Sequence, residues 1–142
     1  ILKNIINKFS NFTPDKFEKI VGKVFEGQGF LVKAKNQYDR EGGDIDLLIS
    51  KQTDMEAFGE QIDNEVEILV QVKKKNGIDK EDIEGVKQLI KQSKSMNKEN
   101  TKKMLISLVD EFTDECKKEA DRYNVSLING KEFAEIYLKT MI

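Results

Sequence analysis

The sequence predicts an α/β fold in which a mixed central sheet is flanked by helices on both faces. Three observations indicate this fold: two helical segments open the chain, three strand-like segments follow between residues 30 and 73, and helices then alternate with strands. Successive strands favour antiparallel pairing and strands separated by a helix favour parallel pairing, so the sheet is expected to be mixed. We expect the order α-α-β-β-β-α-β-α-β-α within one domain, residues 1–142.

Two helices are expected before the first strand. Apolar residues at helical spacing predict a short helix in residues 1–9. Because no methionine opens the chain, residues 1–11 are either this N-terminal helix or the remnant of a boundary to a missing domain. Thr13 and Pro14 predict the start of the second helix, as its N-cap and its first helical residue. The apolar stripe of this helix leaves Glu18 at the edge of the core.

Three strands are expected in the middle of the chain. Residues 30–35 alternate, with Phe30, Val32 and Ala34 on one face, and residues 45–49 form an apolar run. Residues 66–73 give the clearest pattern, because every second residue is valine or isoleucine. Since the side-chain period of a strand is two, Gln71 and Lys73 are expected to project together from the opposite face.

The C-terminal half alternates between helices and strands. Asp79 is expected to cap a helix, residues 104–109 to form a buried strand, and Thr113 to start the next helix. A strand in residues 125–128 and an amphipathic helix in residues 133–141 complete the chain.

Histidine is absent and cysteine occurs once, at Cys116. Every mechanism that needs an imidazole is therefore excluded, including Ser-His-Asp and Cys-His nucleophiles. A zinc site would lack ligands and an intramolecular disulfide would lack a second cysteine, so the chain is expected in the reducing cytoplasm. Cys116 is expected to be a small core residue on its helix. No stretch approaches the roughly 18 apolar residues of a membrane helix, and no membrane partner is expected.

The net charge of −2 hides a strong asymmetry along the chain. Residues 37–72 carry 10 acidic and 2 basic groups, whereas residues 73–103 carry 10 basic and 5 acidic groups. Such runs are either solvated faces or a cation site beside a surface that binds a polyanion. Residues 51–64, within the acidic block, lack a clear period, and we expect either an extended hairpin or a mobile loop there.

Polar residues of complementary chemistry gather around the second and third strands. Asp44 and Asp46 lead into the second strand after a glycine-tipped turn, and the third strand ends in Gln71 and Lys73. If these two strands are antiparallel neighbours, Asp46 lies near Gln71 and Lys73 on a shared face. Glu18 lies on the core edge of the helix before them.

This combination suits Mg²⁺, which takes hard oxygen ligands, keeps several waters and uses one or two carboxylates with substrate phosphates. Asp46 and the side-chain oxygen of Gln71 are the expected ligands, with Glu18 direct or through water and the backbone carbonyl of Val72 completing the set. Lys73 is expected to orient the attacking water and to offset charge on the phosphoryl group. Without histidine, a water on the metal is the expected nucleophile, and Mn²⁺ should substitute for Mg²⁺.

The segments GGDIDLLIS and ILVQVKKK resemble the Mrr-type restriction endonucleases, a QxK branch of the PD-(D/E)xK nuclease superfamily. The helix FEKIVGKVFEGQGF is similar to the leading helix of that family, in which a Glu precedes a Gly-aromatic pair as Glu18 precedes Gly29. The segments MLISLV, FTDECKKEA and VSLINGKEF extend the resemblance over about residues 12–136. It implies a restriction-endonuclease-like αβββαβ core with an additional C-terminal αβα extension.

The resemblance carries the family's catalytic residues onto Asp46, onto the pair Gln71 and Lys73, and onto Glu18, with Asp44 as a secondary candidate. It implies a Mg²⁺-dependent endonuclease that hydrolyses DNA phosphodiester bonds. The sequence departs from the broader superfamily at Ile45, where that pattern has Pro. At Gln71 most members have Glu or Asp, and a neutral Gln supplies one charge less to the metal.

Lysines follow the site along the chain. They are expected to contact DNA phosphates, which would position a duplex without reading its bases, and the alternative is a solvated helix face. Gln88 and Gln92 are further polar candidates, for which a solvated surface position is the simpler interpretation. The predicted DNA-binding residues are Lys74, Lys75, Lys87 and Lys91.

Two other functions stay open at the level of sequence. A Holliday-junction resolvase shares the same core and size, and a catalytically inactive nuclease-fold module would bind DNA or protein without cutting. The expected partners are DNA, a second copy in a homodimer, because one site cuts one strand, and a recognition domain or partner protein outside this chain.

Overall fold

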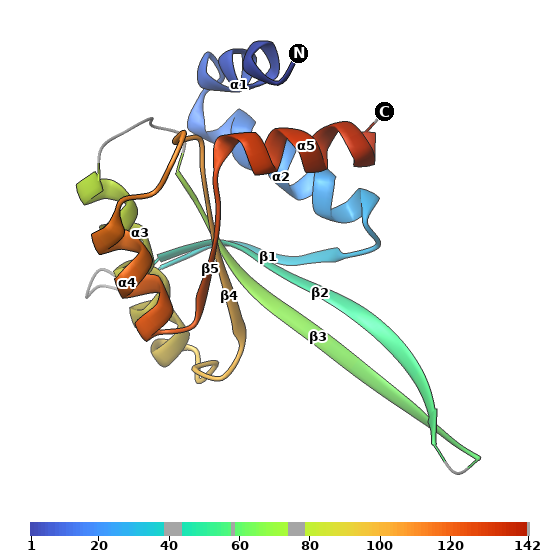
Figure 1. Ribbon diagram of the computed structural model, residues 1–142. Coiled ribbons are helices and arrows are strands. Elements are labelled where there is room, and N and C mark those ends of the chain that lie inside the picture. The colour runs from blue at the N-terminus through green and yellow to red at the C-terminus, as the bar shows by residue number, and fades with distance from the viewer. Residues whose placement is uncertain (39–43, 58, 74–78, 142) are drawn as a thin grey trace.

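The computed structural model describes residues 1–38, 44–57, 59–73 and 79–141 (Figure 1). The order of its helices and strands is the one that the sequence predicts. The elements are α1 (Leu2–Ser10), α2 (Pro14–Gly27), β1 (Leu31–Tyr38), β2 (Asp44–Ala57), β3 (Glu60–Lys73), α3 (Asp79–Ser95), β4 (Lys102–Ser107), α4 (Asp114–Arg122), β5 (Val125–Ile128) and α5 (Gly130–Met141).

The described strands form one mixed sheet in the order β1-β2-β3-β4-β5. The pairs β1–β2 and β2–β3 are antiparallel, whereas β3–β4 and β4–β5 are parallel. The parallel pairs are connected through α3 and α4, because a parallel connection must return to the same end of the sheet. The predicted mixed sheet is confirmed.

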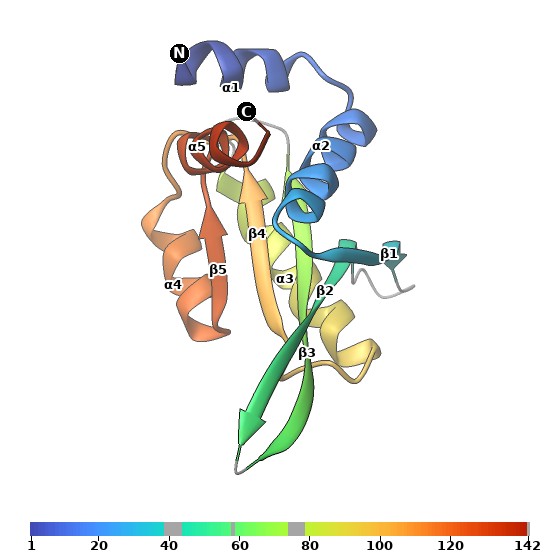
Figure 2. The ribbon, with the colours of Figure 1, turned by 90° about the vertical axis from the view of Figure 1, so that its right-hand side faces the viewer.

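Helices cover both faces of the sheet (Figures 1 and 2). One face, here the α2 face, packs against α2 and α5, with α1 lying against α5, through a core that includes Phe17 and Phe133. The other face, here the α3 face, packs against α3 and α4 through a core that includes Leu69 and Cys116. Cys116 is fully buried, as expected. None of the described helices has the length and hydrophobicity that a bilayer crossing requires.

The N-terminus of α2 forms as predicted. Thr13 Oγ1 accepts a hydrogen bond from the Lys16 N–H at 3.2 Å, and Pro14 opens the helix. Phe17 is fully buried and the next residue, Glu18, is half-buried. Glu18 therefore lies at the edge of the apolar stripe.

The last helix begins earlier than predicted, at Gly130. Asn129 and Glu132 cap it reciprocally: Asn129 Oδ1 accepts from the Glu132 N–H at 2.9 Å, and Glu132 Oε1 accepts from the Asn129 N–H at 3.2 Å. A Cβ atom at Gly130 would lie 3.0 Å from the Leu108 carbonyl oxygen, so glycine allows this close approach. Residues 130–132, which precede the predicted helix, thus form the first turn of α5.

β1 does not alternate as predicted. Its register shifts between Val32, which pairs with Ile49, and Ala34, which pairs with Leu48. Val32 packs into the core of the α2 face and Ala34 into that of the α3 face. The prediction that they share a face is wrong, because the extra residue of a β-bulge, Lys33, separates them.

β2 and β3 are each 14 residues long and extend well beyond the helices (Figure 1). Their pairing continues from Leu47 with Val70 to Ala57 with Glu60. β1 reaches only Ser50, and β4 begins pairing only at Ile68, so the described part further out is a two-stranded ribbon. We call residues 51–57 and 59–66 the hairpin arm. Of the two interpretations of residues 51–64, the extended hairpin is confirmed.

Candidate active site

The start of β2 reaches the end of β3 through the side chain of Asp46. Beyond the pair Leu47 and Val70, Asp46 Oδ2 accepts a hydrogen bond from the Val72 N–H at 2.6 Å. Asp46 is only 7% exposed, so water competes little for this contact. The Asp46 carboxylate thereby replaces a main-chain carbonyl as the acceptor where the pairing of β2 and β3 ends. The hydrogen bond holds Asp46 beside the backbone between Gln71 and Lys73.

Gln71 and Lys73 lie on the α3 face, where both donate to the same atom of α3. Gln71 Nε2 lies 3.1 Å and Lys73 Nζ lies 3.2 Å from Gln88 Oε1. Gln71 is 1% exposed, and Lys73 is half-buried. A Cβ atom at Gly85 would lie 3.1 Å from Lys73 Cε, so this glycine lets the lysine stem lie against the helix. Both polar side chains of the Gln-x-Lys strand are thus held by α3.

The interpretation of Gln88 and Gln92 as solvated surface residues is wrong. Gln88 is half-buried in its contacts with Gln71 and Lys73, and Gln92 is 5% exposed. The one sequence signal for Gln88 is its spacing of three residues from Gly85, which puts the two on one side of a helix. That spacing alone does not identify the strand that the helix covers.

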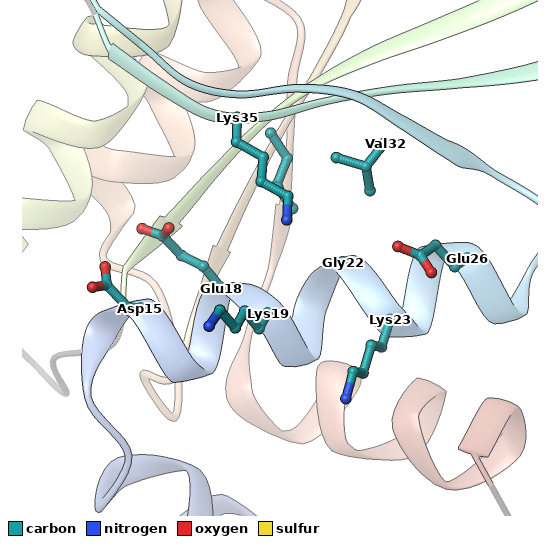
Figure 3. A pocket seen from close by; sticks show the side chains of 9 residues that line it. Asp15, Glu18, Lys19, Gly22, Lys23, Glu26, Val32 and Lys35 are labelled. Carbon is teal, nitrogen blue, oxygen red and sulfur yellow. The ribbon is translucent and has the colours of Figure 1, made fainter.

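Glu18 lies on the opposite face of the sheet from Gln71 and Lys73. Together with Lys35 and Leu47 it lines a cavity of about 450 Å³ between α2 and β1. Figure 3 shows the side chains of Glu18 and Lys35 directed into this cavity. Gln71 and Lys73 are not among its lining residues. The structure therefore brings Asp46, Gln71 and Lys73 to one strand end and places Glu18 across the sheet.

Lys35 was not singled out from the sequence. The β-bulge reverses the alternation of β1, so that Val32 and Lys35, three residues apart, line the same cavity (Figure 3). Lys35 pairs with Leu47, the residue after Asp46. A regular strand would have placed Lys35 on the face away from Val32, which explains why period-two reasoning did not find it.

The strand end offers oxygen ligands of mixed charge. In the described ranges, no three Asp, Glu or Cys side chains converge closely enough to hold a metal ion. The donors are therefore the Asp46 carboxylate, the Gln71 amide and backbone carbonyls such as that of Val72, whose N–H Asp46 binds. Hard oxygen donors of this kind fit Mg²⁺, which retains several waters.

The remaining predicted residues lie around this end. Lys87 and Lys91 are exposed, one turn apart on α3, which is compatible both with phosphate contacts and with a solvated face. Asp44 is the first residue of β2 and pairs with Tyr38, but its side chain is outside the described part of the structure. Two further predicted DNA-binding residues, Lys74 and Lys75, fall outside the described residues.

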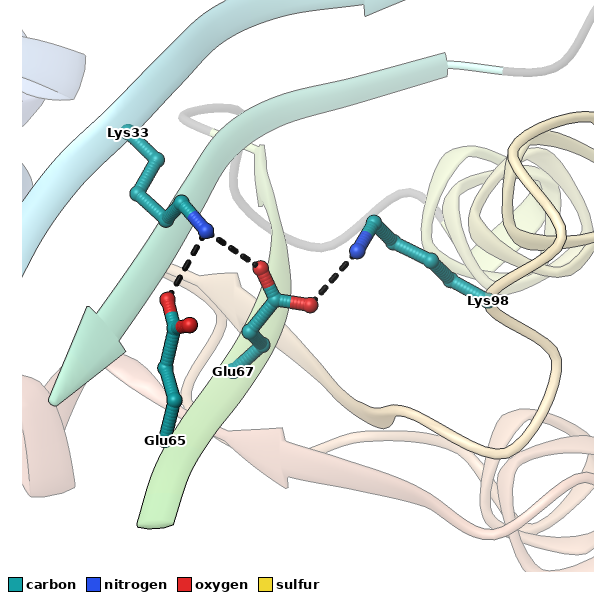
Figure 4. A network of polar contacts seen from close by, with 4 residues as sticks. All are labelled: Lys33, Glu65, Glu67 and Lys98. Atoms are coloured by element: carbon teal, nitrogen blue, oxygen red, sulfur yellow. Dashed lines mark hydrogen bonds and ion pairs between the residues drawn. The ribbon is translucent and has the colours of Figure 1, made fainter. Parts of the chain in front are cut away.

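A second polar network lies at the root of the hairpin arm (Figure 4). Lys33 Nζ donates to Glu65 at 2.8 Å and to Glu67 at 3.0 Å, and Lys98 Nζ donates to Glu67 at 2.5 Å. The hydrogen bond from Lys98, and then that from Lys33, lowers the pKa of Glu67, while Glu65 and Glu67 raise the pKa of Lys33. The arm begins five residues after Asp46, and its strands extend away from that end of β2.

A family model matches most of the chain. Residues 9–137 match the Mrr catalytic-domain model, which is described as a restriction endonuclease. The chain belongs to this Mrr family of restriction endonucleases. Its family is therefore one of DNA nucleases, and the resemblance inferred from the motifs is confirmed.

Two solved structures share the fold of this Mrr-family chain. The MspJI restriction endonuclease, in complex with a 27-mer oligonucleotide, aligns with a TM-score of 0.56 at 18% identity. The DNA modification-dependent restriction endonuclease AspBHI aligns with a TM-score of 0.58 at 14% identity. Both alignments cover 99% of this chain, which spans 30% and 35% of the other two. The fold is that of restriction endonucleases. No protein with a curated description matches the chain.

Proposed function

We propose that this Mrr-family chain is the catalytic domain of a Mg²⁺-dependent DNA endonuclease that hydrolyses phosphodiester bonds. The observation that carries the proposal is the 2.6 Å hydrogen bond from the Val72 N–H to Asp46 Oδ2. This contact joins the two halves of the motif, the Asp of β2 and the Gln-x-Lys of β3. Membership of a family of restriction endonucleases supports the same activity.

Four residues would hold the metal ion. Asp46, Gln71 Oε1 and the Val72 carbonyl would bind it at the strand end, and Glu18, which lies across the sheet, would contribute only through water. When bound, the ion supplies a water of lowered pKa and positive charge for the phosphate oxygens. The carboxylate, carbonyl and water ligands of this site also suit Mn²⁺, which is proposed to substitute.

Lys73 would act on the water and the phosphate. Its ammonium carries three N–H donors, of which the contact with Gln88 uses one. The others can orient the attacking water and bind a phosphate oxygen, so that the positive charge offsets the charge that develops on the phosphoryl group. Because Gln88 is neutral, it holds Lys73 without cancelling that charge.

The surroundings of the site suggest how DNA is held. Phosphate contacts are proposed for Lys74, Lys75, Lys87 and Lys91, which would position the backbone without reading bases. Because one site cuts one strand, duplex cleavage is proposed to need a homodimer or a second encounter. The chain spans about a third of MspJI and of AspBHI, and a recognition domain or partner protein is proposed to supply specificity. Single-domain organisation and a cytoplasmic location stay predictions.

A plasmid nicking assay with Mg²⁺ or Mn²⁺ tests the proposal. The variants are Asp46→Ala and Lys73→Ala, with Lys131→Ala on the exposed surface of α5 as the matched control. We expect the wild type and the control to nick equally, and the two site variants to lose at least about 100-fold in rate. Equal cleavage by all four proteins would contradict the proposal.

Two further measurements distinguish the rival functions. Preferential cutting of a four-way junction over linear duplex would indicate a resolvase. Retained DNA binding without Mn²⁺ binding in calorimetry would indicate an inactive nuclease-fold module.

A further inference from the structure

The geometry points to Gln88 of α3 as a positioning residue of the proposed nuclease site. It fixes which atom of the Gln71 amide is presented to the metal, and it holds Lys73 in the same contact. The inference rests on the proposed function and adds to it a residue outside the Asp and Gln-x-Lys motifs.

Lys73 determines the orientation of the Gln88 amide. An ammonium group can only donate hydrogen bonds, so the Gln88 atom 3.2 Å from Lys73 Nζ has to be the amide oxygen. The same oxygen lies 3.1 Å from the Gln71 amide, which therefore has to present its NH₂ group. The Gln71 oxygen is then the atom turned away from Gln88.

This orientation decides whether Gln71 can be a ligand. The oxygen and the NH₂ group of an amide occupy nearly the same space, but only the oxygen can bind a divalent cation. Rotating the Gln71 amide by half a turn would set its oxygen against Gln88 Oε1, so that a buried acceptor faces another acceptor and the hydrogen bond between the two amides is lost. At a residue that is 1% exposed, such a loss favours the observed orientation by about tenfold or more.

α3 gives Gln88 a rigid base. Val86 and Leu89, on either side of it in the sequence, are fully buried in the core of the α3 face. One turn earlier, Gly85 lies so close to the Lys73 stem that an added Cβ atom would be 3.1 Å from Lys73 Cε. Gly85 and Gln88 thus contact the stem and the ammonium group of the same lysine, which restricts where its remaining donors can point.

The test compares substitutions of Gln88 that keep or remove the acceptor oxygen. Gln88→Met is nearly isosteric and removes it, Gln88→Glu keeps it, and Glu84→Gln alters an exposed residue one turn away as the control. The Mn²⁺ dissociation constant is measured by calorimetry, and kcat and KM are measured in the nicking assay. We expect Gln88→Met to weaken Mn²⁺ binding and lower kcat by about 10- to 100-fold, with KM unchanged and with the protein still fully folded at the assay temperature. Gln88→Glu should keep Mn²⁺ affinity near the wild-type value, as should the control.

A second background separates positioning from a structural role. In Gln71→Ala protein the Gln88→Met substitution should cause no further loss of Mn²⁺ affinity, because the residue through which it acts is gone. An equal loss in both backgrounds, or a fall in Tm that accounts for the loss of activity, would overturn the inference. If Gln88→Met does not fold, Gln88→Asn withdraws the oxygen by one methylene and should give the same Mn²⁺ result.

The failure of this inference differs from failure of the proposed function. Wild-type protein that binds Mn²⁺ and cuts DNA, together with a Gln88→Met protein of equal affinity and rate, would overturn the role of Gln88 alone. Wild-type protein that neither binds Mn²⁺ nor cuts DNA would overturn the proposed function and the role of Gln88 with it.

Discussion

Two regions of the β2–β3 strand pair, its end at Asp46 and the root of the hairpin arm, carry polar residues in different surroundings. At the end with Asp46 and Gln71, these side chains are 7% and 1% exposed and are held by the Val72 N–H and by Gln88. At the root of the hairpin arm, the side chains of Lys33 and Glu65 are 41% and 42% exposed and pair across open surface. The two regions differ in whether a helix packs on them. α3 packs on the sheet at the end with Gln71, whereas no helix of the described residues packs on the hairpin arm.

This comparison changes the meaning of the acidic block in residues 37–72. Its acidic residues form two groups along the strands: Asp44 and Asp46 at the start of β2, and those of the hairpin arm further out on β2 and β3. Buried hydrogen bonds to a charged group contribute about 1.5–3 kcal/mol, whereas exposed ion pairs contribute about 1 kcal/mol or less. We therefore expect the two groups to respond very differently to the same chemical change.

Exchanging a carboxylate for an amide in each of the two regions gives the largest expected contrast. Asp46→Asn should lower the nicking rate at least about 100-fold, because the metal loses its nearest charged ligand, while the amide oxygen can still accept from the Val72 N–H. Glu65→Gln should change the rate less than about twofold. Comparable losses of nicking rate in the plasmid assay would remove the distinction between the two regions.

Adding a methyl group at Gly85 tests whether α3 holds Lys73. Gly85→Ala should lower kcat by about tenfold, because the new Cβ atom would lie 3.1 Å from Lys73 Cε. Alanine favours a helix by about 1 kcal/mol over glycine, but the same Cβ atom would also lie 3.1 Å from Leu105 Cδ1 in the core, so the free energy of unfolding in urea should change by about 1 kcal/mol or less. Gly22→Ala in α2, where a Cβ atom meets only Val32 at 3.8 Å, is the control for the stability effect. Lower activity that is matched by lower stability would count against a positioning role of α3.

Shortening the hairpin arm should have a small effect. Gln52 and Glu65 form a matched pair, so an Asn-Gly turn can replace residues 53–64 without a change of register. Ile49 and Ile68, which stay in the shortened protein, belong to the buried core. Among the described residues, none that the deletion removes belongs to it, so the nicking rate should stay within about twofold of wild type. The free energy of unfolding should change by about 1 kcal/mol or less. A shortened protein that does not fold would show that the arm is part of the core.

The smallest expected effect concerns Glu67 and pH. Its pKa is lowered from the ordinary 4.5 by the hydrogen bonds from Lys98 and Lys33, so the stabilisation is present above that value and is lost as pH falls through the lower folded-state pKa. Glu67→Gln should reduce the free energy of unfolding at pH 7 by about 1 kcal/mol or less. The difference from wild type should vanish in acid and shrink in high salt. A difference that persists at low pH would indicate a contribution other than charge.

Local patterns predicted the elements well. The cap at Thr13, the helix from Thr113 and the strand of residues 66–73 follow from rules that act within a few residues, and the structure confirms each of them. The convergence of Asp46 with the Gln-x-Lys strand depends only on the antiparallel pairing of two neighbouring strands, which the sequence also indicated.

Features that depend on contacts between distant segments were not predictable. One extra residue in β1 moves Lys35 to the α2 face, and periodicity contains no signal for such a bulge. The role of Gln88 becomes visible only when α3 is known to pack on β3. The sequence of a helix does not indicate which strand it will pack on. The position of Glu18 across the sheet depends likewise on which face α2 covers, which the apolar stripe alone leaves open.

The most direct test of the proposed site is a crystal structure of the wild-type protein soaked in Mn²⁺. We expect anomalous density between the Asp46 carboxylate and Gln71 Oε1, with the Gln71 NH₂ group still directed to Gln88. Density at another position, or none between Asp46 and Gln71 at a Mn²⁺ concentration that supports cleavage, would contradict the account.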